Sequence, residues 1–152
     1  MKFMILVKAN KESEAGVMPK KELLAAMGNF NEELLRAGVL LAADGLQRSE
    51  KGARVRFSGS KRTVVDGPFT ETKELVAGYW IWEVKSMEEA IEWVKRCPNP
   101  HEGDSEIEIR PMFDASDFDP EYTAGLVERR ERLAAELAAA GRPVPEHLHK
   151  KN

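Results

Sequence analysis

Residues 63–82 read Thr63-Val64-Val65-Asp66-Gly67-Pro68-Phe69-Thr70-Glu71-Thr72-Lys73-Glu74-Leu75-Val76-Ala77-Gly78-Tyr79-Trp80-Ile81-Trp82. A β-branched run stops at the breaker Asp-Gly-Pro, and a second, more apolar run begins at Leu75. This pattern predicts two strands joined by a charged loop at residues 66–74. Because rigid strands on either side can hold the geometry of such a loop, we expect a functional site there.

The amino-acid composition limits which classes of protein this chain can belong to. The chain has 152 residues, of which 42% are hydrophobic and 32% charged, with a net charge of −3. These values indicate a globular domain of ordinary size, and the acidic balance argues against nucleic acid as a partner. No apolar run reaches the ~20 residues of a membrane span, and residues 3–7 are fewer than the ~7–15 of a signal-peptide core. We therefore predict a cytoplasmic protein with no membrane partner.

Cysteine and histidine provide no pattern for a metal site. Cys97 is the one cysteine, so an internal disulfide is excluded, and we expect a small buried residue at a helix end. His101 precedes Glu102 and Asp104 but lacks the i, i+4 spacing of two ligands on a helix, so a solvated loop is expected. No P-loop, Rossmann fingerprint or nucleophile elbow is present. We predict neither a metal nor a cofactor.

Hydrophobic periodicity gives the order of the elements. Strands are predicted at residues 2–8, 39–43, 75–84 and 106–110, with a hairpin at residues 54–57 and 62–65. Helices are predicted from Pro19 to the Gly38 turn, from Ser86 to Pro98, and over residues 121–140, whereas residues 9–18 read as a loop.

Helix-end signals refine these boundaries. Ser86 and Glu89 match a capping box, and Asp119 is an N-cap followed by Pro120 at the first helical position. Gly141 and Pro143 end the last helix. The tail at residues 144–152, with His147 and His149, is expected to be frayed and exposed.

The order of elements predicts an α+β fold, a ferredoxin-like sandwich with an inserted β-hairpin and an added C-terminal helix. The strands at 2–8 and 75–84 are apolar on both faces, and exposing Trp80 or Trp82 would leave a large apolar patch. We therefore predict a homodimer through the open sheet faces, with the helix at 121–140 as an alternative cover. A shift in composition after Phe113 predicts a domain at residues 1–113 and a helical extension at 114–152.

The motif Asp66-Gly67-Pro68-Phe69, followed by Glu71, Lys73-Glu74 and Gly78-Tyr79, resembles the signature of the DGPF family. That family belongs to the YCII-related proteins of the dimeric α+β barrel superfamily. The resemblance covers residues 1–113 and implies a ferredoxin-like fold, dimerisation through the sheets and a cleft at the barrel. The family is mostly uncharacterised, and some members are similar to, or fused with, partners of alternative sigma factors.

The resemblance also shows a departure from the family pattern. In YCII proteins a histidine–aspartate pair has been suggested as the active site. Its histidine would fall near Met27 or Gly28, where this chain has no histidine. The pair is therefore not carried over to this chain.

Three ionisable residues are candidates for catalysis: Asp66, Lys73 and Glu71. Asp66 is either a general base at a strand end or a carboxylate that caps its own turn. Lys73 lies between the carboxylates Glu71 and Glu74. Lys73 either forms an ion-pair network with these two carboxylates or, if it faces a dry cleft, acts as an acid–base catalyst.

Four other residues are candidates for ligand binding: Asp44, Tyr79, Phe69 and Arg56. Asp44 either reaches the charged loop from a strand end or forms a turn with Gly45. Tyr79 and the tryptophans either stack on a ligand or fill the core and the interface. Arg56 belongs to a group of basic residues in the hairpin region. This group either binds an anionic substrate, a nucleic-acid backbone or an acidic partner, or forms a solvated strand edge that prevents aggregation. Its members are Arg48, Lys51, Arg54, Arg56, Lys61 and Arg62.

Two functions follow from these candidates. The first is binding of a small polar or anionic ligand, with cofactor-free acid/base catalysis. The second is a non-catalytic accessory role, in which the hairpin or the helix at 121–140 holds a partner such as a transcription factor.

Overall fold

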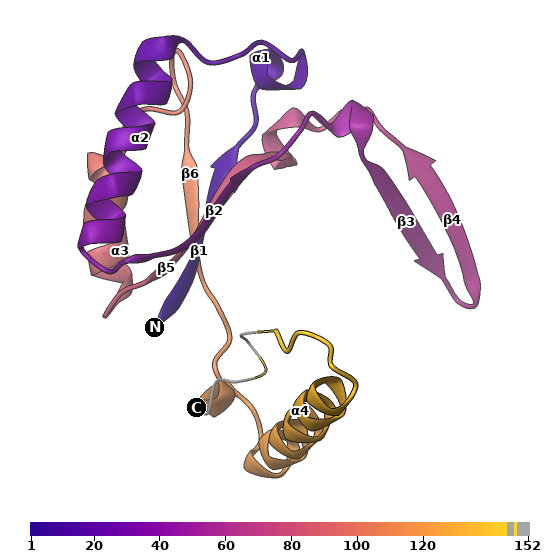
Figure 1. Ribbon diagram of the computed structural model, residues 1–152. Coiled ribbons are helices and arrows are strands. Elements are labelled where there is room, and N and C mark those ends of the chain that lie inside the picture. The colour runs from indigo at the N-terminus through magenta and orange to yellow at the C-terminus, as the bar shows by residue number, and fades with distance from the viewer. Residues whose placement is uncertain (146–147, 149–152) are drawn as a thin grey trace. The chain divides into compact units, whose positions relative to one another are not determined.

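The computed structural model describes residues 1–145 and residue 148. The chain forms two compact units, residues 1–112 and residues 113–152, and each is described separately (Figure 1). Most of the predicted frayed tail, including His147 and His149, lies outside the described residues. Within the described part, no helix is long and apolar enough to cross a membrane, and a cytoplasmic location stays a prediction.

A four-stranded antiparallel sheet with the order β2-β5-β1-β6 forms the centre of the first unit. Its strands and the two long helices of this unit are β1 (Lys2–Lys8), α2 (Lys21–Arg36), β2 (Leu40–Gly45), β5 (Val76–Glu83), α3 (Met87–Arg96) and β6 (Ile107–Pro111). The connectivity β-α-β-β-α-β with this strand order is that of a ferredoxin-like sandwich. The predicted α+β fold class is therefore confirmed.

The core lies between one face of this sheet and the two helices. Trp80 and Trp82 of β5 are buried there, and the Phe30 ring of α2 meets both edge-on, with ring centroids 6.4 and 6.2 Å apart. Burying one such large side chain contributes roughly 1.5–3 kcal/mol. The expectation that these tryptophans need a partner molecule to cover them is wrong, because α2 and α3 of the same chain cover them.

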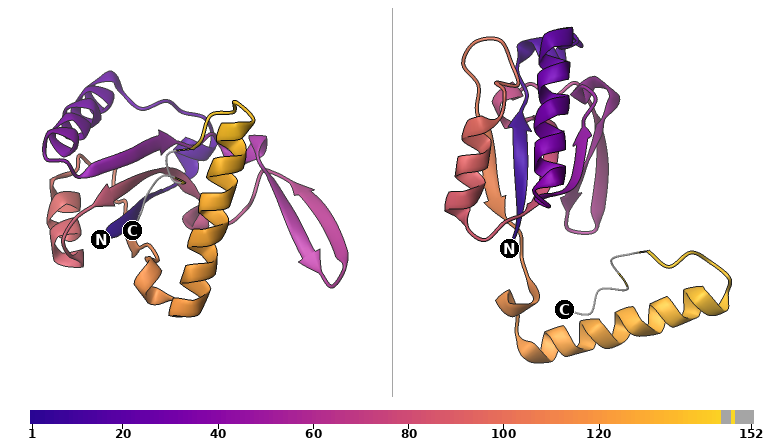
Figure 2. Two further views of the ribbon diagram at one scale, coloured as in Figure 1. Left: turned by 60° about the horizontal axis from the view of Figure 1, so that its bottom comes forward. Right: turned by 60° about the vertical axis from the view of Figure 1, so that its left-hand side comes forward.

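The opposite face of the sheet carries a smaller apolar surface. Met4 is paired with Ile81, and Leu6 with Tyr79, so alternation along the strands directs these four side chains away from the helices. All four are half-buried, and both long helices lie on the other side (Figure 2).

The predicted helix ends need two corrections. Pro19 precedes α2 instead of lying in its first turn, because α2 begins at Lys21 after the N-cap Lys20. The Ser86 hydroxyl accepts a hydrogen bond from the Glu89 amide at 3.3 Å, which confirms the cap of α3. The reciprocal half of the box is wrong, because the Glu89 carboxylate accepts from the amide of Lys85, at 2.7 Å, instead of from Ser86. Ser86 has extended backbone, which places the preceding amide within reach of that carboxylate.

The prediction of a loop at residues 9–18 is wrong in part, because this segment contains a short helix, α1 (Lys11–Glu14). The Asn10 side chain accepts from the Ser13 amide at 2.8 Å, and the Ser13 hydroxyl accepts from the Asn10 amide at 2.9 Å. This reciprocal capping fixes one helical turn. Four polar residues show no apolar period, so periodicity could not reveal it.

The predicted hairpin is confirmed as a separate two-stranded sheet of β3 (Ala53–Ser58) and β4 (Lys61–Asp66). It projects from the side of the first unit (Figure 1). Short 3-10 helices lie near its base, η1 (Ser49–Lys51) before β3 and η2 (Thr72–Glu74) after β4.

The Asp-Gly-Pro-Phe motif fastens the base of this hairpin to η1. A Cβ atom on Gly67 would lie 1.8 Å from the Ser49 carbonyl oxygen, so only glycine fits there. The Gly67 amide donates to the Gly52 carbonyl at 3.0 Å, and the Phe69 amide donates to the Ser49 hydroxyl at 3.0 Å. The Ser49 hydroxyl and amide in turn donate to the carboxylate of Glu14 in α1. The motif thereby joins the hairpin, η1 and α1.

The second unit contains η3 (Ala115–Asp117) and one long helix, α4 (Pro120–Ala139). The Asp119 carboxylate accepts from the Glu121 amide at 2.8 Å, and Pro120 begins the helix, so the predicted N-terminus is confirmed. Gly141 follows its end with φ +65°, a backbone conformation that favours glycine.

The close approach at Gly67 predicts opposite effects of one substitution at two glycines. Gly67→Ala must displace the η1 backbone, and we expect it to lower the free energy of unfolding by roughly 1–3 kcal/mol. Gly28→Ala is the matched control, because a Cβ atom in that part of α2 meets nothing within 4 Å. It should raise stability by roughly 0.5–1 kcal/mol. Urea unfolding measures both, and equal effects would contradict the packing described at Gly67.

Cys97 predicts a loss of stability at high pH. Its half-buried thiol ends α3, as expected, and burial raises its pKa from 9.0 to about 11. Above pH 9 the unfolded chain loses this proton while the folded chain keeps it, so stability falls as pH rises from about 9 to 11. Urea unfolding at several pH values should show the wild type losing stability relative to Cys97→Ala across this window. A difference that stays constant with pH would refute the prediction.

Candidate functional site

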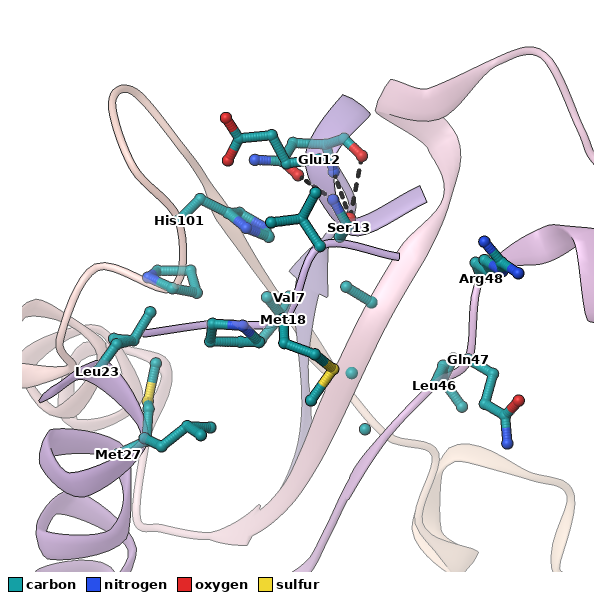
Figure 3. Close-up of a pocket in the computed structure, with 18 of the residues that line it drawn as sticks. Val7, Glu12, Ser13, Met18, Leu23, Met27, Leu46, Gln47, Arg48 and His101 are labelled. Atoms are coloured by element: carbon teal, nitrogen blue, oxygen red, sulfur yellow. Dashed lines mark hydrogen bonds between the residues drawn. The ribbon is translucent and has the colours of Figure 1, made fainter. Parts of the chain in front are cut away.

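A cleft of about 1370 Å³ opens at one end of the central sheet in the first unit (Figure 3). It is lined by the sheet, by the N-terminal half of α2, and by three connecting segments, residues 10–20, 45–51 and 99–102. Small-molecule sites in proteins typically occupy ~300–1,000 Å³ and are lined mainly by apolar groups. This cleft is large enough to take a small organic molecule.

The inner wall of the cleft is apolar. The sheet contributes Val7 and Trp80, and α2 contributes Leu23 and Met27 (Figure 3). Further apolar side chains surround the mouth and are largely exposed: Val17 59%, Met18 78%, Leu24 52% and Leu46 51%. A ligand seated here would remove this apolar surface from water, which favours binding.

Charged groups of both signs form the rim. Lys20, at the start of α2, pairs with Glu102 in the 99–102 segment, and the hydrogen bond that the Lys20 ammonium donates to the Glu102 carboxylate raises the pKa of Lys20. Arg48 pairs with Glu50 at 3.1 Å. Lys51 also lines the cleft and forms no ion pair among the described residues. These pairs are largely exposed, so each adds little stability and can be exchanged for a ligand contact.

His101 is the group in the cleft that sequence reasoning missed. The sequence indicated a solvated loop, but the ring is half-buried, and Nε2 lies 2.6 Å from the Lys8 carbonyl oxygen. Because a carbonyl only accepts, Nε2 carries the hydrogen and Nδ1 keeps its lone pair in the neutral ring. Only the tertiary contact between this segment and the end of β1 reveals the placement, since the local sequence has no recognisable spacing.

Asn31 supplies a second oriented polar group. Its Oδ1 accepts from the Trp80 indole nitrogen at 2.8 Å, and the residue lines the cleft. With the oxygen engaged, the amide nitrogen retains its two donors. The cleft therefore offers an acceptor at His101 and a donor at Asn31 beside an apolar wall.

Two of the predicted ligand-binding residues line this cleft, Asp44 and Tyr79. They are paired on neighbouring strands, and the Tyr79 hydroxyl donates to the Asp44 carboxylate at 3.5 Å, a long hydrogen bond. Their role in ligand binding stays a prediction.

The other predicted site residues lie outside the cleft lining. Asp66, Glu71 and Lys73 are exposed near the hairpin base, and within the described residues their side chains form no ion pair or hydrogen bond. Phe69 lies under the Arg54 guanidinium, 3.8 Å from ring centroid to Cζ, and Arg56 is exposed on β3. The structure therefore places these residues at the hairpin, away from Asp44 and Tyr79, and their predicted roles stay untested.

Within the described part of the chain, no group of three or more histidine, cysteine, aspartate or glutamate side chains is arranged to hold a metal ion. The cleft itself offers groups for hydrogen bonding and charge pairing.

Comparisons with known proteins identify the family. The chain is 27% identical over 106 residues to an uncharacterised protein of Rhizobium meliloti (strain 1021), covering 68% of this chain and 86% of that protein. It is similar to the solved structure of 5-chloro-2-hydroxyhydroquinone dehydrochlorinase from Burkholderia phenoliruptrix AC1100 in complex with 2,5-dihydroxybenzoquinone. That match has 18% identity and a TM-score of 0.44, and covers 78% of this chain and all of the other. The YCII-related domain matches residues 1–116, and the chain belongs to that family.

Proposed function

We propose that the first unit binds a small organic molecule that has an apolar body and a polar or anionic group. The observation that supports this proposal is the cleft itself, which combines an apolar wall with oriented polar groups. The apolar body would lie against Val7, Leu23 and Trp80. The polar group would lie toward the rim, where Lys20, Arg48 and Lys51 line the cleft.

The basic residues of the rim support an anionic group on the ligand. Lys51 lines the cleft without an ion pair among the described residues, and Arg48 holds only the exposed Glu50. A carboxylate or phenolate placed between them would gain charge-assisted hydrogen bonds.

His101 supports acid/base catalysis without a cofactor as the finer form of this proposal. Imidazole is the side chain used most often for general acid–base catalysis. The contact with the Lys8 carbonyl orients the ring, so that Nδ1 is the nitrogen left to take a proton from a ligand. Asn31 would then donate to an oxygen that gains charge as the proton leaves. The roles predicted for Asp66, Lys73 and Glu71 remain alternatives to this one.

Two leucines of α2 give a matched test of ligand binding. Leu24 lines the cleft and Leu35 does not, although both side chains are more than half exposed. The probe is 8-anilinonaphthalene-1-sulfonate, which has an aromatic body and one anionic group. We expect Leu24→Gln to weaken its binding three- to tenfold, because apolar contact surface is lost, and Leu35→Gln to leave it unchanged. Fluorescence titration measures both dissociation constants.

Equal effects of the two substitutions, or fluorescence that does not saturate, would exclude this cleft as the binding site. The same titration on Asp66→Asn and Lys73→Gln tests the 66–74 loop. A loss of binding in those variants with an intact fold would move the site from the cleft to the loop.

We also propose that the chain forms a homodimer through the open face of its sheet. The apolar side chains Met4, Leu6, Tyr79 and Ile81 on that face support it. We expect light scattering to give twice the chain mass of 17.1 kDa, and Ile81→Glu to halve that value because it places a charge in the interface. Leu35→Glu, on the exposed surface of α2, is the control and should leave the mass unchanged. A wild-type chain that remains monomeric at high concentration would exclude this interface.

The accessory role is a second candidate, supported by α4. This helix has no buried residue, and Tyr122 and Leu133, which share one helix face, are exposed by 57% and 44%. An amphipathic helix with an uncovered apolar stripe can bind a groove on a protein partner.

A further inference from the structure

The β3–β4 hairpin has two chemically different faces. Directly opposed residues of an antiparallel pair point to the same side. One face therefore combines the pairs Ala53 with Asp66, Val55 with Val64, and Phe57 with Arg62. The other face holds Arg54, Arg56 and Lys61 with their partners Val65, Thr63 and Ser58. The first set is called the Val55 face below.

The Val55 face is apolar at its centre and lies open to water. The exposed fractions are 50% for Val55, 64% for Val64 and 70% for Phe57. A two-stranded hairpin is marginally stable alone, and an apolar face of this kind marks an interaction surface. The cleft does not use this face, because none of its residues lines the cleft.

The hairpin is held firmly at its base. Hydrogen bonds join Gly67 to Gly52 and Phe69 to Ser49, and the Arg54 guanidinium packs on the Phe69 ring. These contacts direct the hairpin away from the central sheet of its own unit (Figure 1). A cover for the Val55 face must therefore come from outside that sheet.

We propose that the Val55 face packs against the same face of a second copy, with the two hairpins antiparallel about a two-fold axis through Val55 and Val64. In this arrangement each of these valines lies over its own equivalent. The large Phe57 at the tip lies over the partner subunit's Ala53, which is small. Arg62 at the tip meets the partner subunit's Asp66 at the base.

Side-chain size and charge both favour a second copy of the chain, in the antiparallel arrangement, as the partner of the Val55 face. The Asp66 carboxylate forms no ion pair among the described residues. Arg62 donates from one guanidinium nitrogen to the carbonyls of Gly59 and Lys61 and packs over the Phe57 ring, 4.3 Å from Cζ to the ring centroid, so its other guanidinium nitrogens keep their donors for a carboxylate. A parallel arrangement, about a two-fold axis along the strands, would place Arg62 over the partner subunit's Phe57 and Asp66 over the partner subunit's Ala53, so the opposite charges would not meet. The antiparallel one pairs opposite charges and leaves Arg54, Arg56 and Lys61 on the outer faces, away from the contact.

The contact is small. Six positions per copy are fewer than the roughly 20–30 residues a side of a stable interface, so the hairpins form a weak contact by themselves. Its detection requires a method that reports which residues meet, at high protein concentration. It requires neither the ligand in the cleft nor the dimer through the open sheet face.

Cross-linking at neighbouring positions tests the proposal. Val64→Cys and Thr63→Cys are introduced one at a time into Cys97→Ala, since both positions are exposed and face opposite sides of β4. A short bismaleimide should link two chains through position 64 at least tenfold more efficiently than through position 63. Equal efficiency at the two positions, or no linked dimer at position 64, would overturn the proposal.

Charge exchange in the Val64→Cys chain tests the antiparallel register. Arg62→Asp alone and Asp66→Arg alone each create two like-charge contacts per dimer and should lower the cross-linked yield at least fivefold. Arg62→Asp combined with Asp66→Arg restores opposite charges and should restore the yield to within twofold. The antiparallel register would be overturned if the double variant gave a cross-linked yield as low as that of the single variants, or if the single variants left the yield unchanged.

Discussion

The contact of Gly67 with Ser49 connects most parts of the first unit that bear on function. The two backbones approach so closely that any side chain at position 67 would overlap the Ser49 carbonyl. Glycine is required at position 67 because there is no space for a side chain; its backbone conformation does not require glycine, since its φ is not positive. Once the backbones are in contact, the Ser49 hydroxyl can accept from Phe69 and donate to Glu14. One serine thereby links the hairpin, η1 and the short helix α1.

That junction lies beside the cleft. Glu14 ends α1, and residues 10–20 form one wall of the cleft, whereas Arg48 and Lys51 on either side of Ser49 belong to its rim. The segment at 99–102 completes the wall through His101 and through the pair of Glu102 with Lys20. The cleft is thus built by loops that are fixed to the sheet and to each other, an arrangement that combines a stable scaffold with variable binding groups.

Much of the architecture could be predicted because its causes are local. The alternation in residues 75–84 and 2–8, the Gly38 turn and the Asp119-Pro120 start each act within a few neighbouring residues. The site was harder to predict. Only Asp44 and Tyr79 of the predicted site residues line the cleft, and His101 was missed, because its position depends on a contact with Lys8 that is 93 residues away. Asp66, Glu71 and Lys73 lie outside the cleft lining, and their predicted roles stay untested.

The amino-acid sequence alone determined the strands, the long helices and the ferredoxin-like order, because periodicity, caps and breakers act over one or two turns of chain. The family followed from the resemblance carried by the motif Asp66-Gly67-Pro68-Phe69. Only the tertiary structure decided which face of β5 the helices cover, and therefore that the tryptophans are buried within one chain. It likewise decided that His101, Asn31 and Trp80 meet at one cleft, because long-range contacts between segments far apart in sequence bring these side chains together.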